Sequence, residues 1–121
     1  MTRIALVVDD SPSVRQLVGH TLRQAGFEVI EGTDGKDGLA HLAHEHVDLV
    51  ITDLNMPEMN GLELVTRLRG LRQYRFTPVL MLTTENGDAR KQAGRAAGAT
   101  GWITKPFDPK QLLQVIARVL A

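Results

Sequence analysis

Short apolar runs alternate with segments of helical periodicity along the chain, and this alternation restricts the possible folds more than any other feature. The runs are rich in β-branched residues and cover residues 4–8, 27–30, 48–52, 78–83 and 101–103. Each run predicts a strand and is followed by a predicted helix. Strands that are apolar on both faces and separated by helices form a parallel sheet covered on both sides by right-handed crossovers. The sequence therefore predicts five βα units.

Local signals mark where several of the helices begin and end. Ser11 can accept a hydrogen bond from a free N–H of the first turn, and Pro12 suits the first helical position. Further helix starts with capping-box spacing are expected at Asn60 and Asp108, and helix stops at Gly26 and Gly98.

Length and composition exclude several classes of protein. A chain of 121 residues is long enough for one core, so we expect a single domain over residues 1–121 with no output domain. Its 14 basic and 14 acidic residues balance, which predicts neither a nucleic acid nor a membrane partner. The absence of cysteine and of an N-terminal signal peptide favours a cytoplasmic location. We expect a monomer.

Polar residues gather where the predicted strands end. In a doubly wound sheet, ligands bind outside the carboxyl ends of the strands. The residues at these ends are Asp9, Asp10, Asp53, Thr83, Thr84 and Lys105. Three acids and one lysine carry a formal charge of −3 + 1 = −2. Oxygen ligands without cysteine suit Mg²⁺ better than zinc, so the acids predict a magnesium site.

A carboxylate-bound metal beside a lysine and hydroxyl groups is suited to phosphoryl transfer. The positive charges can neutralise the oxygens of the transferring group while a nucleophile attacks in line. Asp53, at the end of the middle strand, is the natural nucleophile and would form an acyl phosphate.

The sequence resembles the receiver domains of bacterial two-component response regulators, and among them the stand-alone CheY-type chemotaxis regulators. The resemblance rests on Asp9 and Asp10 in VVDDSPSVR, Asp53 in ITDLNMPEMNG, Thr83 in MLTT and Lys105 in TGWITKPF. It implies a flavodoxin-like (βα)5 fold with strand order 2-1-3-4-5. It also implies a phosphorylation-activated switch rather than an enzyme. Such a switch catalyses only its own phosphorylation and dephosphorylation.

The resemblance also implies a role for each site residue. Asp53 accepts the phosphoryl group from a histidine of a CheA-like sensor kinase, and Lys105 pairs with the phosphoryl oxygens. Asp10, Asp53 and the carbonyl of Asn55 bind Mg²⁺, with Asp9 acting mostly through bound water. The other implied roles are a switch hydroxyl at Thr83, a switch aromatic at Trp102, rate tuning at Asn55 and Glu85, and a cis bond between Lys105 and Pro106. Position 102 departs from the commoner tyrosine or phenylalanine, which leaves the amplitude of the switch open.

The implied partner is the flagellar motor switch or another target. The fourth predicted helix, within residues 87–99, has alanines where the other helices have leucine and valine, and it carries Arg90, Lys91 and Arg95. We expect it to pack weakly and to form, with the fifth strand and helix, a docking surface for an acidic partner.

Two alternatives use the same site. A phosphate sink would drain the kinase without binding a motor. A magnesium-dependent aspartyl phosphatase would need a cap insertion and a second acid two residues after its nucleophile, where this chain has Asn55.

Overall fold

A computed structural model describes residues 2–84 and 87–121. Its centre is a parallel five-stranded sheet in the order β2-β1-β3-β4-β5, which confirms the predicted doubly wound fold. The strands are β1 (Ile4–Val8), β2 (Glu28–Gly32), β3 (Leu49–Asp53), β4 (Val79–Thr83) and β5 (Gly101–Thr104). The helices are α1 (Pro12–Gln24), α2 (Gly35–His44), α3 (Gly61–Arg69), α4 (Asp88–Ala97) and α5 (Pro109–Leu120), with a short 3₁₀ helix at Arg72–Tyr74.

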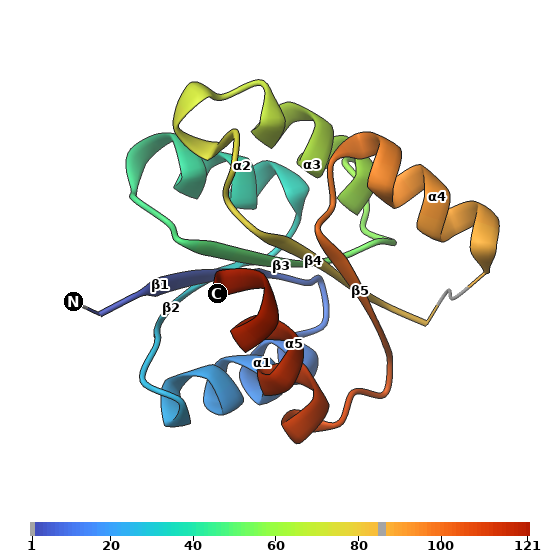
Figure 1. The fold of residues 1–121 in the computed structure, drawn as a ribbon. Coiled ribbons are helices and arrows are strands. Elements are labelled where there is room, and N and C mark those ends of the chain that lie inside the picture. The colour runs from blue at the N-terminus through green and yellow to red at the C-terminus, as the bar shows by residue number, and fades with distance from the viewer. Residues whose placement is uncertain (1, 85–86) are drawn as a thin grey trace.

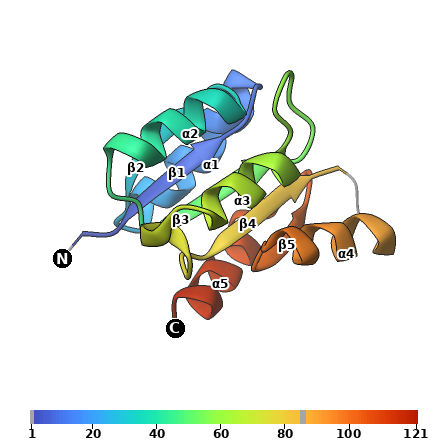
Figure 2. The same ribbon diagram turned by 90° about the horizontal axis from the view of Figure 1, so that it is seen from above.

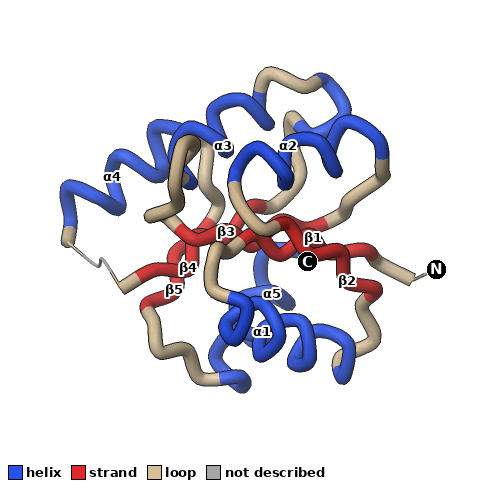
Figure 3. The backbone as a smooth tube through the Cα atoms, turned by 180° about the vertical axis from the view of Figure 1, so that it is seen from behind, coloured by secondary structure: helices blue, strands red, loops and turns tan. Residues whose placement is uncertain are grey.

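The helices cover both faces of the sheet. α1 and α5 lie on one face, and α2, α3 and α4 lie on the other (Figures 1 and 3). Alternate residues of each strand therefore enter two separate cores. In β1, Ala5 and Val7 pack with α1 and α5, while Leu6 and Val8 pack with α2 and α3. Burial on both faces explains why the strands read as continuous apolar runs.

The observed strand ends differ from the predicted ones, except in β1. β2 covers Glu28–Gly32 instead of residues 27–30, and β3 covers Leu49–Asp53 instead of 48–52. β4 begins one residue later than predicted, and β5 extends to Thr104. A strand continues for as long as the neighbouring strand pairs with its backbone, even where its side chains are polar. Glu31, for example, is polar but pairs with Val7 of β1.

The predicted helix caps are present. Ser11, Asn60 and Asp108 each accept a backbone N–H of the helix that follows. Gly98 ends α4 in the left-handed conformation, with φ of 111°, and Gly26 follows α1 with φ of 95°. These conformations favour glycine because a Cβ atom would be strained there.

α4 packs more loosely than the other helices, as its alanine-rich sequence predicts. Gly94 is its buried residue, whereas α3 buries Gly61, Leu64, Val65 and Leu68. Viewed from above, α4 lies at the β5 edge of the sheet, away from α2 (Figure 2). Over residues 2–84 and 87–121, no helix has the length and apolarity needed to span a membrane.

Candidate functional site

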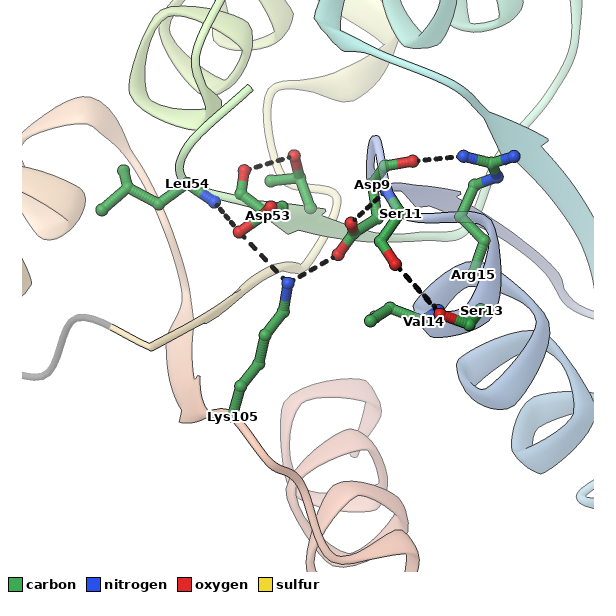
Figure 4. Close-up of polar contacts among 9 residues, drawn as sticks. Asp9, Ser11, Ser13, Val14, Arg15, Asp53, Leu54 and Lys105 are labelled. Carbon is green, nitrogen blue, oxygen red and sulfur yellow. Dashed lines mark hydrogen bonds and ion pairs between the residues drawn. The ribbon is translucent and has the colours of Figure 1, made fainter. Parts of the chain in front are cut away.

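The carboxyl ends of β1, β3, β4 and β5 bring the predicted site residues to one edge of the sheet. Asp9 and Asp10 directly follow β1, Asp53 is the last residue of β3, and Lys105 directly follows β5. Because parallel strands end on the same side, residues far apart in sequence meet there. In Figure 4 the Lys105 side chain points between Asp9 and Asp53.

Lys105 bridges two carboxylates from different strands. Its Nζ atom lies 2.8 Å from Oδ2 of Asp9 and 3.4 Å from Oδ1 of Asp53. The Lys105 side chain is 17% exposed, and the side chains of Asp9 and Asp53 are 2% and 9% exposed. Screening by water is therefore weak at this contact, and the charges interact more strongly than a surface pair would. The bond between Lys105 and Pro106 is cis, as the resemblance implied.

The three acids form a compact group of oxygen ligands. Asp9, Asp10 and Asp53 each place a carboxylate oxygen within 4.8 Å of the others. With one lysine against three carboxylates, the formal charge of the cluster is −3 + 1 = −2. The oxygen ligands, the charge and the exposure of Asp10 fit a hard divalent cation that keeps part of its water shell. The donor set is therefore compatible with Mg²⁺.

The Asp53 carboxyl is held in an environment that opposes its ionisation. Burial raises the pKa of Asp53, and the nearby Asp9 carboxylate raises it further. Lys105 and the N–H of Leu54 act in the opposite direction, the latter through a 2.8 Å hydrogen bond to Oδ1. An additional cation at the cluster would favour the ionised form, which is the nucleophilic one.

Gly61 sets the position of Asp53 and was not among the predicted site residues. A Cβ atom at Gly61 would lie 2.2 Å from the carbonyl oxygen of Asp53 and 2.8 Å from Cε of Met81. The N–H of Gly61 also donates to the carbonyl of Leu54. The start of α3 thus packs directly on the backbone that carries Asp53. The only sequence signal is a glycine directly after the N-cap Asn60.

Arg15 is a second residue that the sequence did not single out. Its Nη1 atom donates a 2.6 Å hydrogen bond to the carbonyl oxygen of Asp9 (Figure 4). Its Nε atom lies 3.4 Å from Oε1 of Glu31 on β2. In the sequence, Arg15 is an ordinary basic residue of an amphipathic helix.

The remaining predicted residues lie around this cluster in different ways. Thr83 is buried at the end of β4, and its carbonyl accepts the N–H of Lys105. Trp102 is half-buried on β5, where its ring packs against Gly94 of α4. Asn55 is exposed in the loop after β3. Glu85 lies outside the described residues.

Comparisons with known proteins agree with this geometry. Residues 5–117 match the family of response regulator receiver domains. The chain is 42% identical to the chemotaxis protein CheY homolog of Campylobacter jejuni over 117 residues, which cover 95% of this chain and 90% of the relative. It is 40% identical to chemotaxis protein CheY1 of Helicobacter pylori, covering 95% and 94%. The crystallised chemotaxis protein CheY4 of Vibrio cholerae superposes with a TM-score of 0.96 at 50% identity, covering 99% and 100%.

Proposed function

Because this chain belongs to the response regulator receiver domain family and is of the CheY type, we propose that it is a phosphorylation-activated signalling switch with Asp53 as its phosphoacceptor. The observation that carries this proposal is the grouping around the Asp53 carboxylate, which lies 3.4 Å from the Lys105 ammonium group and has oxygens of Asp9 and Asp10 within 4.8 Å. The proposed nucleophile, its counter-charge and the carboxylates proposed as metal ligands all lie at one sheet edge.

We propose that a carboxylate oxygen of Asp53 attacks the phosphorus atom of a phosphohistidine in a CheA-like sensor kinase. A P–O bond forms, the P–N bond breaks, and the imidazole leaves with the bonding electrons. Asp9, Asp10, Asp53 and the carbonyl of Asn55 would hold Mg²⁺, which supplies charge neutralisation for the phosphoryl oxygens. Lys105 can turn from the Asp53 carboxylate, 3.4 Å away, to the phosphoryl oxygens that are added there.

The signal would reach the surface through Thr83 and Trp102. On β4, Thr83 follows Leu82, which pairs with Asp53 of β3. Trp102 of β5 pairs with Met81 of β4. Thr83 therefore lies on the strand next to Asp53, and Trp102 lies one strand further along the sheet. We propose that the Thr83 hydroxyl moves toward the phosphoryl group and that Trp102 turns inward, while Asn55 and Glu85 tune the rates.

Energetics require more than one hydrogen bond for this switch. Reversing a population from 1:99 to 99:1 takes about 5.5 kcal/mol. One neutral hydroxyl hydrogen bond contributes about 1 kcal/mol. Charge compensation at Lys105 and repacking of Trp102 would have to contribute the remainder.

The proposed partner surface comprises α4, β5 and α5. A small pocket between α4 and β5 is lined by Trp102 and by basic residues of the helix, among them Lys91 and Arg95. A change in the Trp102 ring would alter this pocket directly. An acidic segment of a target such as the flagellar motor switch would complement its charge. A phosphate sink would accept phosphate from the kinase and bind no such target.

The proposal is tested by treating the protein with acetyl phosphate and MgCl₂ and measuring its intact mass. We expect the mass gain of one phosphoryl group, its loss in EDTA, and its removal by hydroxylamine, which cleaves acyl phosphates. Asp53→Asn should abolish the gain. Asp108→Asn is the matched control, because asparagine replaces aspartate well at an exposed N-cap. A gain that persists in Asp53→Asn would overturn the assignment.

A further inference from the structure

The Asp9–Asp10 peptide is held from outside the acid cluster by one cationic side chain. Arg15 of α1 donates from Nη1 to the Asp9 carbonyl oxygen at 2.6 Å. This carbonyl belongs to the peptide that joins two proposed metal ligands. The orientation of this peptide therefore affects the directions in which the Asp9 and Asp10 side chains extend.

Arg15 is itself fixed by its surroundings. Its side chain is 13% exposed, and its Nε lies 3.4 Å from Oε1 of Glu31. Among residues 2–84 and 87–121, Arg15 Nε is a buried nitrogen without a hydrogen bond, so burial of this guanidinium is only partly compensated. Arg23, two turns further along α1, contacts the other oxygen of Glu31 at 3.6 Å and is 51% exposed. Glu31 thus joins β2 to both arginines, and the guanidinium of Arg15 also reaches the backbone of the acid pair.

We propose that Arg15 is a positioning residue that holds the Asp9–Asp10 peptide in the geometry required for Mg²⁺ binding, with Glu31 as its anchor. This inference rests on the proposed magnesium site. Arg15 would not touch the ion, and it would act through the peptide between the two carboxylates. Residues that orient metal ligands from outside typically change affinity by about 10- to 100-fold when removed.

The sign of the effect separates positioning from simple electrostatics. Arg15 is a cation beside a proposed cation site, so charge alone predicts that its removal strengthens Mg²⁺ binding. Positioning predicts the opposite result. Arg15→Lys sharpens the contrast, because lysine keeps the charge but its single nitrogen lacks the fork that bridges the Asp9 carbonyl and Glu31.

The experiment measures the Mg²⁺ dissociation constant from the rise in thermal unfolding midpoint over a MgCl₂ series, with each curve referred to its own midpoint in EDTA. We expect about tenfold weaker binding in Arg15→Gln and weaker binding also in Arg15→Lys. Arg23→Gln is the matched control. It removes the other arginine from Glu31 and should leave the dissociation constant unchanged.

Each outcome decides the question. Equal or tighter Mg²⁺ binding in Arg15→Gln overturns the proposal, as does an equal loss in Arg23→Gln. If Arg15→Gln fails to fold, Arg15→Lys carries the test alone, and wild-type affinity in that variant overturns it. Absence of Mg²⁺ binding by the wild-type protein would instead refute the magnesium site of the proposed function.

Discussion

The ammonium group of Lys105 lies 2.8 Å from Oδ2 of Asp9, a residue 96 positions earlier in the sequence. The same nitrogen lies 3.4 Å from Oδ1 of Asp53. One side chain therefore joins the ends of β1, β3 and β5. This contact places a positive charge beside two buried carboxylates and is the counter-charge of the proposed chemistry.

Replacing Lys105 should destabilise the metal-free protein. Lys105→Met leaves the buried carboxylates of Asp9 and Asp53 without their shared counter-ion, and breaking a buried pair costs about 3 kcal/mol or more. Urea unfolding in EDTA measures the loss, and MgCl₂ should restore part of it. Lys36→Met is the control, because Lys36 and Glu58 form a pair whose side chains are 67% and 64% exposed. Equal losses in the two variants would contradict the role of this buried contact.

Asp53→Asn should stabilise the protein in a pH-dependent way. Burial and the Asp9 carboxylate raise the folded-state pKa of Asp53 above its unfolded value, so ionisation at higher pH costs folding free energy. The stability advantage of the variant should be small below the ordinary carboxyl pKa. It should grow as the pH rises toward the raised pKa and stay constant above it.

Urea unfolding of the wild type and of Asp53→Asn in EDTA, from about pH 3 to pH 8, gives this difference. A stability difference that shrinks as the pH rises would show that the Asp53 pKa is lowered rather than raised.

Gly61→Ala should displace Asp53, the proposed phosphoacceptor. The added Cβ would lie 2.2 Å from the Asp53 carbonyl oxygen, so the start of α3 and the end of β3 must separate. We expect a loss of about 2–3 kcal/mol in unfolding free energy and much slower phosphorylation by acetyl phosphate. The control is Gly70→Ala at the other end of α3, where the nearest atom would be the Arg67 carbonyl oxygen at 3.3 Å. Wild-type phosphorylation in Gly61→Ala would refute the positioning role of this glycine.

Gly94→Ala should alter the environment of Trp102. The new Cβ would lie 2.8 Å from Cζ3 of the indole ring, so the ring must move. Trp102 is the only tryptophan of the chain, and its emission spectrum reports the change directly. Overpacking should outweigh the higher helix propensity of alanine and destabilise the protein by about 1 kcal/mol.

Gly87→Ala provides the comparison for Gly94→Ala, because a Cβ added at this α4 N-cap position would have no atom of the described residues within 4 Å, apart from position 87 and its chain neighbours. The emission spectrum of this variant should match that of the wild type. An unchanged spectrum in Gly94→Ala would mean that α4 and the Trp102 ring are not in contact at this position.

The fold and the grouping of the candidate site residues could be predicted from the sequence because their signals are local. Apolar runs of about five residues, helix periodicity and the caps at Ser11, Asn60 and Asp108 each involve neighbouring positions. Once the sheet is parallel, the residues that follow its strands must lie at one edge. The grouping of Asp9, Asp10, Asp53 and Lys105 follows from this rule and from the resemblance to receiver domains.

The tertiary structure decided the strand ends and the contacts that depend on close packing. β2 extends to Gly32 because β1 continues beside it, although the apolar run stops at Ile30. Gly61 must be small because the Asp53 backbone passes against it, and Gly94 because the Trp102 ring does. Arg15 and Arg23 both contact Glu31, and the guanidinium of Arg15 also donates to the Asp9 carbonyl oxygen. These relationships join atoms from separate elements, so the sequence determined which residues form the elements, and three-dimensional packing determined which of them control the site.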